Sequence, residues 1–175
     1  IVMEIFKGDR VYLKEINVFD INERVMSWFD DPELMKFYTS SKNKITKEKL
    51  LLSIEEGRKS KNLYTYGIYT NDNQTIIGTI KLGPIHPIHR TSDLVALIGD
   101  RNYLGKGLSV DAISLGNQLA FEKFHIRKLY GGMYESNIAS IKAYTRSGWL
   151  IEGRLKGFYE VNGMNEDRIL VGCFN

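Results

Sequence analysis

A glycine-rich segment, Leu104-Gly-Lys-Gly-Leu-Ser109, carries the residues best suited to hold an anion. Gly105 and Gly107 let the backbone turn tightly, so that several N–H groups point at one ligand. The segment stands where a predicted strand becomes a predicted helix, whose N-terminus adds about half a positive charge. Unless the two glycines only shape this turn, a phosphate-binding loop is predicted from Leu104, Gly105, Lys106, Gly107, Leu108 and Ser109.

Two better-known phosphate motifs do not fit the segment. A P-loop needs four residues between its glycines and then Lys-Ser or Lys-Thr, whereas five residues separate Gly99 from Gly105 and Gly107 follows Lys106. The dinucleotide fingerprint needs a third glycine where Val110 stands. P-loop kinase or GTPase chemistry is therefore not expected, and NAD binding is a weak alternative.

A second group of polar residues recurs at helical spacing. Asn137, Ser140 and Tyr144 are three and four residues apart, so one helix face presents an amide, a hydroxyl and a phenol. Read singly, Asn137 is typical of a helix N-cap, Ser140 of a packing residue and Tyr144 of a core aromatic. Together they suit a site that faces the ligand of the glycine loop.

Hydrophobic periodicity predicts the elements that position these residues. Residues 93–99 read as a strand, 107–124 as a long helix and 128–134 as a second strand, which makes a βαβ unit with two parallel strands. A short helix over 137–146 follows the second strand. Its polar face can therefore approach the glycine loop.

The rest of the chain predicts a β-meander with helices before this unit and an antiparallel pair after it. Together these elements indicate one α/β domain over residues 1–175, with about seven strands and about four helices. The further elements are strands at 10–16, 64–69, 75–82, 150–158 and 167–174, helices from 20 or 22 to 28 and from 46 to 61, a turn at 30–33 and a loop at 83–90.

Composition excludes several functions. The 24 basic and 21 acidic residues give a net charge of +3 without a charged block, which argues against a nucleic-acid binder. The single cysteine, Cys173, excludes an internal disulfide and CxxC-type zinc sites, so no metal is expected. Apolar runs are too short to cross a membrane, and residues 1–7 lack the pattern of a signal peptide, which favours a cytoplasmic protein.

The order of these motifs resembles one known family. The glycine loop, helix, strand, Asn-x-x-Ser-Ile-x-x-Tyr from Asn137 and Gly148-Trp149 are similar to the GNAT superfamily of acetyl-CoA-dependent N-acetyltransferases. Trp28-Phe-Asp-Asp-Pro-Glu33, Glu152-Gly-Arg154 and Asn162-Gly163 resemble the branch of ribosomal-protein alanine, spermidine and amino-sugar acetyltransferases. The resemblance implies a mixed sheet whose parallel pair splays apart, and transfer of the acetyl group of acetyl-CoA to a primary amine.

The resemblance also implies a role for each motif residue. Backbone N–H groups of the loop would hold the CoA pyrophosphate, although the family often has Gln or Arg at Leu104 and Gly or Ala at Ser109. Tyr144 would protonate the departing thiolate. The remaining cofactor contacts would come from Leu97, Ile98 and Gly99, beside the pantetheine arm and the thioester carbonyl, and from Asn137 and Ser140 on the other side.

The proton acceptor for the attacking amine is less determined. Asp93, His89, Glu135 and a water relay are all candidates, and a histidine titrates near neutrality. Paired histidines beside prolines, His86 and His89, also suit a solvated loop. An acyl-enzyme is not expected, since Cys173 stands near the chain end and no serine has a recognisable His-acid partner.

The amine substrate that accepts the acetyl group is the least determined by the sequence. Aromatic and basic residues near its expected entrance favour an amino-sugar nucleotide over a protein N-terminus or a polyamine, because rings stack and Arg or Lys pairs with a diphosphate. These residues are Trp28, Phe29, Tyr38, His86, His89, Arg90, Arg154, Lys156 and Tyr159. Asp30, Asp31 and Glu33 would reverse the preference if they faced the site. A non-catalytic acetyl-CoA sensor is the rival of another class, and a homodimer stays open.

Overall fold

One mixed sheet runs through the computed structural model, which describes residues 3–38 and 44–175. Within these residues the sheet has eight strands in the order β1-β2-β3-β4-β5-β6-β8-β7. β5 (Thr91–Ile98) and β6 (Lys128–Tyr134) are parallel, as the predicted βαβ unit requires. The other neighbouring strands pair antiparallel.

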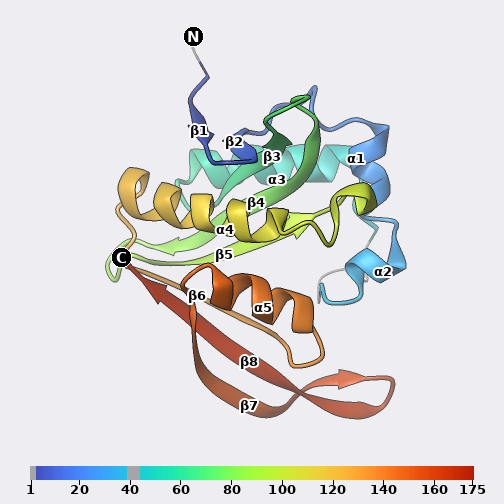
Figure 1. Cartoon of the computed structure of the whole chain (residues 1–175), viewed down its shortest axis with the longest axis vertical. Helices are drawn as coiled ribbons and strands as arrows, with labels where there is room; N and C mark the ends of the chain where they lie inside the picture. The colour runs from blue at the N-terminus through green and yellow to red at the C-terminus, as the bar shows by residue number, and fades with distance from the viewer. Residues whose placement is uncertain (1–2, 39–43) are drawn as a thin grey trace.

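Helices cover both faces of this sheet. α4 (Leu108–Gln118) and α5 (Ile138–Arg146) lie on one face, and α3 (Lys47–Lys59) lies behind it (Figure 1). The alternation of side chains along β2 serves both layers: Leu13 packs into the core under α4, and Tyr12 packs into a second core with α1 and α3.

The first half confirms the predicted helix starts. Asn22 caps α1 (Glu23–Trp28) by accepting from the Val25 N–H at 3.0 Å, and Thr46 caps α3 by accepting from the Lys49 N–H at 3.2 Å. The strands of this half are β1 (Ile5–Lys7), β2 (Val11–Glu15), β3 (Tyr64–Thr70) and β4 (Ile76–His86).

Two additions raise the element counts above those expected. In the described residues there are five α-helices, because the turn at 30–33 continues into α2 (Pro32–Met35), whose first N–H groups bond to the Asp31 carboxylate. β1, only three residues long, adds an edge strand by pairing with β2. Segments this short carry too little periodicity to be read from sequence.

The loop predicted at 83–90 is wrong for its first half. β4 continues to His86 and pairs with β5 across a bulge between Leu82 and Ile85. A bulge accommodates Pro84, which has no N–H to give to a ladder. β4 and β5 therefore form one long hairpin that ends in a tight turn.

The elements of the second half of the chain are those predicted, but some of them begin or end at other residues. The long helix ends at Gln118 and passes into a π-helical turn, Leu119–Lys123, where the Phe124 N–H bonds back to the Leu119 carbonyl. The terminal hairpin is longer than expected, with β7 (Leu150–Val161) and β8 (Met164–Phe174) joined at Asn162-Gly163. Both turn residues have positive φ, as an Asn-Gly hairpin turn requires.

Buried polar bonds fix α5 beside α4. The Trp149 indole N–H donates to the Asn117 side chain at 2.9 Å, and the Asn117 amide donates to the Ser147 carbonyl at 2.9 Å. Trp149 in turn meets the ring of Tyr144 edge-on at 4.8 Å. The packing after α5 therefore holds Tyr144 against β5.

Two features are absent from residues 3–38 and 44–175. No helix there is long and apolar enough to cross a membrane. No group of three or more His, Cys, Asp or Glu side chains there could hold a metal ion.

Candidate active site

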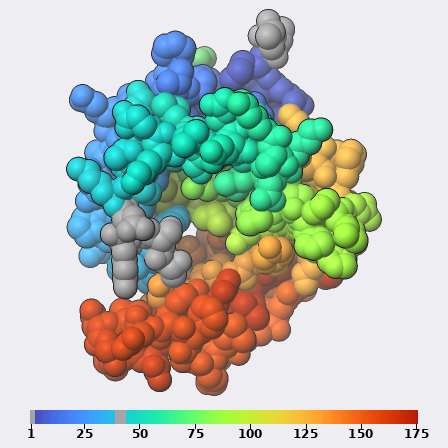
Figure 2. All heavy atoms as spheres, turned by 180° about the vertical axis from the view of Figure 1, so that it is seen from behind, coloured from blue at the N-terminus to red at the C-terminus, as the bar shows by residue number. Residues whose placement is uncertain are grey.

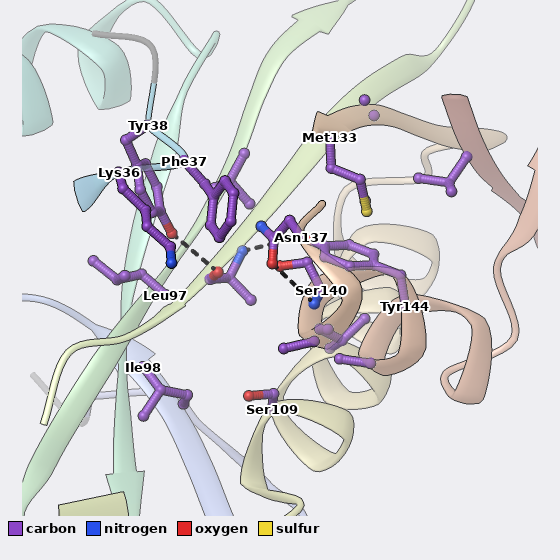
Figure 3. Close-up of a pocket in the computed structure, with 18 of the residues that line it drawn as sticks. Lys36, Phe37, Tyr38, Leu97, Ile98, Ser109, Met133, Asn137, Ser140 and Tyr144 are labelled. Atoms are coloured by element: carbon purple, nitrogen blue, oxygen red, sulfur yellow. Dashed lines mark hydrogen bonds between the residues drawn. The ribbon is translucent and has the colours of Figure 1, made fainter. Parts of the chain in front are cut away.

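The parallel strands diverge soon after they begin, and a cavity opens between them. β5 and β6 are in register only from Thr91 with Lys128 to Asp93 with Tyr130. The cavity beyond this point has a volume of about 840 Å³ and is called the cleft below. The space-filling view from behind shows a hollow between the C-terminal hairpin and the layers above it (Figure 2). Figure 3 shows Phe37 and Tyr38 on one side of β5 and α5 on the other.

The edge of β5 directs backbone groups into the cleft. The Ala96 N–H and the Leu94 carbonyl both bond to the Tyr144 hydroxyl, so these residues point their polar groups away from β4. Polar groups alternate in direction along an antiparallel ladder. Those of Ile98 therefore also point into the cleft, whereas Leu97 bonds toward β4 and contributes its side chain to the lining.

Gly99 differs from the expectation. Its N–H donates to the Ile77 carbonyl at 2.8 Å, and a Cβ at this position would lie 2.1 Å from the ring of Trp28. Gly99 is thus a site of close packing against Trp28 and does not line the cleft. Its donor is already used by β4, so of the two predicted carbonyl-polarising groups only Ile98 is placed for that role.

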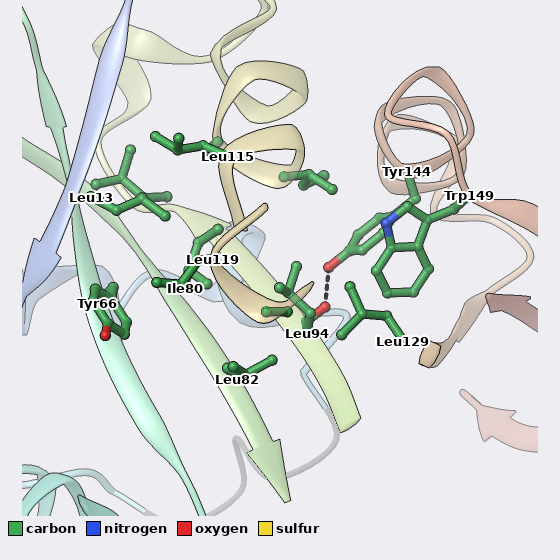
Figure 4. Close-up of a cluster of buried hydrophobic side chains, with 14 of the residues drawn as sticks. Leu13, Tyr66, Ile80, Leu82, Leu94, Leu115, Leu119, Leu129, Tyr144 and Trp149 are labelled. Carbon is green, nitrogen blue, oxygen red and sulfur yellow. Dashed lines mark hydrogen bonds between the residues drawn. The ribbon is translucent and has the colours of Figure 1, made fainter. Parts of the chain in front are cut away.

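Tyr144 closes the gap between α5 and β5. Its hydroxyl donates to the Leu94 carbonyl at 2.7 Å and accepts from the Ala96 N–H at 3.1 Å, and the first of these bonds is drawn in Figure 4. Burial raises the pKa of the phenol well above its usual range, with a small opposing effect of the Ala96 bond. The hydroxyl therefore carries its proton at neutral pH.

Asp93 stands where the two strands part, and it lines the cleft. Burial raises the pKa of its carboxyl to about 6, while the Leu94 N–H and the charge of Arg168 act in the opposite direction. A carboxyl with this pKa is mostly ionised at neutral pH and can still accept a proton readily.

The polar face predicted on α5 is present. Asn137 and Ser140 line the cleft together with Tyr144. Asn137 also caps the helix, since its side-chain oxygen accepts from the Ser140 N–H at 3.3 Å. The capping role and the site position are therefore compatible.

The glycine loop lies beside the cleft. Gly105 and Gly107 have φ of +73° and +74°, and within the described ranges α4 begins without a side-chain cap. Leu104 and Ser109 line the cleft, Lys106 is exposed, and Leu108 is buried in the core. A loop whose first-turn N–H groups lack a capping side chain, and whose Gly105 has open space around it, fits a bound phosphate group.

Arg10 supports this loop, and the sequence analysis did not predict this role. Its guanidinium donates to the carbonyl oxygens of Lys106 at 2.6 Å and Gly107 at 3.0 Å, and it pairs with Asp111 at 2.7 Å. Arg10 engages carbonyl groups and so does not occupy the loop N–H groups, of which that of Leu104 already donates to the Arg101 carbonyl at 3.2 Å. A lone arginine before a strand gave no sequence signal for this contact.

His89 does not join the other predicted catalytic residues. It stands in the exposed turn between β4 and β5, where its ring stacks on His86 at a centroid distance of 4.5 Å, and it does not line the cleft. Glu135 also lies outside the lining and pairs with Arg154. Of the three residues assigned to catalysis, the structure brings together Asp93 and Tyr144.

The residues expected to bind the acceptor are divided. Tyr38 and Tyr159 line the cleft, and so does Glu33, whose carboxylate pairs with Lys36 at 3.4 Å, whereas Asp30 and Asp31 do not. Trp28 is buried under Gly99, and Arg154 and Lys156 pair with Asp167 at 2.8 and 3.5 Å. Those outside the cleft lining are Trp28, Phe29, His86, His89, Arg90, Arg154 and Lys156.

A cation that was not predicted, Arg168 on β8, lines the cleft together with Lys36 and Arg101. Its guanidinium lies over the ring of Phe158 at 5.0 Å. The available signal was an arginine at the start of a strand that continues as Ile169-Leu-Val171.

Comparison with known proteins places this site in a family. The family profile of the acetyltransferase (GNAT) domain matches residues 10–149, and the chain therefore belongs to the GNAT acetyltransferases. It is an acyltransferase with the splayed parallel pair that the resemblance implied.

Relatives span nearly the whole chain at low identity. The Probable N-acetyltransferase YjcK of Bacillus subtilis (strain 168) is 24% identical over 97% of this chain and 96% of its own length. The spermidine N(1)-acetyltransferase of Escherichia coli (strain K12) is 24% identical over 95% of this chain and 82% of its own. A solved structure of RimL, a ribosomal L7/L12 alpha-N-protein acetyltransferase in complex with coenzyme A, superposes with a TM-score of 0.85 at 15% identity, covering 98% of each chain.

Proposed function

We propose that this protein transfers the acetyl group of acetyl-CoA to a primary amine by direct attack of the amine nitrogen. The observation that carries the proposal is the position of Asp93 and Tyr144 in one cleft, both tied to the same stretch of β5. One is a carboxyl with a pKa of about 6, and the other is a phenol that keeps its proton. Such a pair can accept one proton and donate another.

Acetyl-CoA supplies an activated acetyl group on a thiol leaving group. The residues that would hold it are the loop Leu104 to Ser109, for the pyrophosphate, and Asn137 and Ser140 on the opposite wall. The Ile98 N–H, directed into the cleft by the alternation along β5, would polarise the thioester carbonyl. Arg10 keeps the loop in the conformation that presents its N–H groups.

The protons balance through the two side chains. Asp93 accepts a proton from the incoming ammonium, directly or through water, and the free amine forms the new C–N bond. The C–S bond breaks, the Tyr144 hydroxyl gives its proton to the sulfur, and the resulting phenolate takes the second proton that the attacking nitrogen loses as it becomes an amide. The Ala96 N–H, which already donates to the Tyr144 oxygen at 3.1 Å, stabilises the charge left there. The reaction yields the amide, CoA with a free thiol, and one proton that passes to solvent.

For the acceptor, an amino-sugar nucleotide is our preferred class, ahead of a protein N-terminus and a polyamine. Its support is a group of neighbouring rings: Phe37 and Tyr159 line the cleft, and Tyr134 contacts both, tilted against Phe37 at 5.6 Å and stacked on Tyr159 at 3.7 Å between ring centroids. Ring faces of this kind stack on sugars and bases. The basic residues first expected to bind the diphosphate do not line the cleft, so the support rests on the rings.

Thiol release from acetyl-CoA tests the reaction. We expect release that depends on an amine, with kcat/KM compared for a 4-amino-sugar nucleotide, spermidine and an Ala-initiated peptide. A hundredfold advantage for either of the last two would overturn the sugar preference and leave the reaction standing. Stabilisation by acetyl-CoA without thiol release for any amine would instead identify a sensor.

A further inference from the structure

Arg168 brings a partly exposed guanidinium to the cleft, and one nitrogen of this group has no acceptor among the described residues. Its Nε is buried without a hydrogen-bond partner, and no carboxylate of the described chain lies within ion-pair distance of it. The other two cations of the cleft lining are paired: Lys36 with Glu33 at 3.4 Å, and Arg101 with Asp31 at 2.5 Å. A guanidinium without an ion-pair partner, one of whose nitrogens is buried without an acceptor, is left unsatisfied unless a ligand supplies the acceptor.

The sheet makes room for this guanidinium. A Cβ at Gly132 would lie 1.9 Å from Nε of Arg168, so the arginine can cross β6 only because residue 132 is a glycine. The preceding glycine, Gly131, would place its Cβ 3.3 Å from the carboxylate of Asp93. Two consecutive glycines therefore open β6 beside both the proposed base and the unpaired cation.

The surroundings make Arg168 an effective anion receptor. Phe158 supports its guanidinium at 5.0 Å, and Tyr159 packs edge-on against Phe158 at 5.0 Å. A guanidinium placed over an aromatic ring can still donate from its terminal N–H groups to a carboxylate or phosphate. Such bonds are stronger in a partly desolvated cavity than in water.

We propose that Arg168 binds a negatively charged carboxylate or phosphate group of the acceptor, so that this enzyme acetylates anionic amines in preference to polycations. The inference rests on the proposed function, since it takes the cleft as the acceptor site. It separates this chain from a polyamine acetyltransferase, because the unpaired arginine repels a substrate whose charges are all positive.

Matched amines test the preference. Glucosamine 6-phosphate is compared with glucosamine for the phosphate, and β-alanine with its methyl ester for the carboxylate, with spermidine as the polycation. We expect kcat/KM to be about tenfold to a hundredfold higher for the charged member of at least one pair, and the pair that responds identifies the anion. Equal values within both pairs, or spermidine as the best substrate, would overturn the proposal.

Variants assign the preference to Arg168. Arg168→Gln should remove the advantage of the anionic amine over its neutral partner, so the ratio of the two kcat/KM values is the readout, and Arg168→Lys should keep part of that advantage. Gly132→Ala should reproduce the loss without removing a charge, because its methyl group displaces the guanidinium. Gly153→Ala is the matched control: its Cβ would meet only the Leu170 side chain at 3.6 Å among the described atoms.

A binding measurement tests the role of Arg168 separately from the proposed acetyl transfer. Calorimetric titration of the same amine pairs into the protein with CoA reads the preference whether or not turnover occurs. Absence of transfer with an anion preference that depends on Arg168 would refute the proposed reaction and support the receptor. Transfer by the wild-type protein with no preference for the anionic amine would support the proposed reaction and refute the receptor.

Discussion

The guanidinium of Arg10 bonds to the carbonyl oxygen of Lys106 at 2.6 Å, across 96 residues of sequence. The same group also bonds to the Gly107 carbonyl and the Asp111 carboxylate, so one side chain connects the loop to the first turn of α4. Both glycines of this loop are in the left-handed conformation. Because glycine also populates other backbone conformations readily, this one needs contacts that stabilise it. The anchor of the proposed phosphate site thus comes from the residue before β2.

Removing this anchor should weaken acetyl-CoA binding. We expect Arg10→Ala to raise the Kd about tenfold or more, because a loop that samples other conformations presents its N–H groups less often. Arg10→Lys should fall between, since an ammonium cannot span both carbonyls and Asp111. Isothermal titration with acetyl-CoA measures the Kd, and the control is Arg58→Ala, which breaks a surface pair between Arg58 on α3 and Glu15 on β2. An unchanged Kd for Arg10→Ala would show that the loop holds its shape alone.

A side chain at Gly107 should block the cradle. Gly107 has a φ of +74°, and a Cβ there would lie 3.1 Å from the Arg10 guanidinium. Gly107→Glu therefore adds strain, bulk and a negative charge, and we expect the thermal shift with acetyl-CoA to disappear. Gly163→Glu in the β7–β8 turn, at φ +77°, imposes similar strain away from the loop and should keep the shift. A retained shift in Gly107→Glu would exclude this loop as the phosphate site.

Loss of the Tyr144 hydroxyl should slow turnover more than it disturbs the fold. Tyr144→Phe leaves the Leu94 carbonyl and the Ala96 N–H without their partner, which costs about 1–3 kcal/mol of stability. We expect kcat to fall roughly 10 to 10³-fold if the hydroxyl protonates the sulfur. Steady-state kinetics and thermal melts separate the two effects. A lower melting temperature with an unchanged kcat would make Tyr144 only a clamp between α5 and β5.

Asp93 should set the acidic limb of the pH profile. Its carboxyl has a pKa of about 6, so kcat/KM should rise with pH through about 6 as the base ionises, and Asp93→Asn should lack this limb with activity lower by roughly 10² to 10⁴-fold. The control is Asp72→Asn, in the exposed turn between β3 and β4. A limb that persists in Asp93→Asn would assign the base elsewhere.

The raised pKa of Asp93 should also make the stability of the fold depend on pH. Because its pKa is raised from 3.8 to about 6 in the folded protein, burial of Asp93 costs least below about pH 4, and stability is lost as the pH rises through about 6. The melting temperature of Asp93→Asn minus that of the wild type should therefore increase from pH 4 to pH 8. A difference that does not change with pH would contradict the raised pKa.

The sequence alone was sufficient where the information is local. The left-handed glycines of the loop, the cap at Asn137, the Asn162-Gly163 turn and the strand-helix-strand order all follow from residue types within a few positions of one another. Helical spacing likewise predicted that Asn137, Ser140 and Tyr144 share a face, and all three line the cleft. Turn chemistry and periodicity are properties of short segments, so they can be read without the fold.

The tertiary structure decided what depends on which strands become neighbours. β8 lies between β6 and β7, and this pairing brings Arg168 across Gly132 into the cleft, while the turn before β5 carries His89 away from it. Arg10 reaches the loop because β2 packs under α4, and Gly99 loses its predicted role because Trp28 packs on it. No local pattern encodes such contacts. They arise from burial of apolar faces contributed by distant segments, which also sets the pKa of Asp93 and Tyr144.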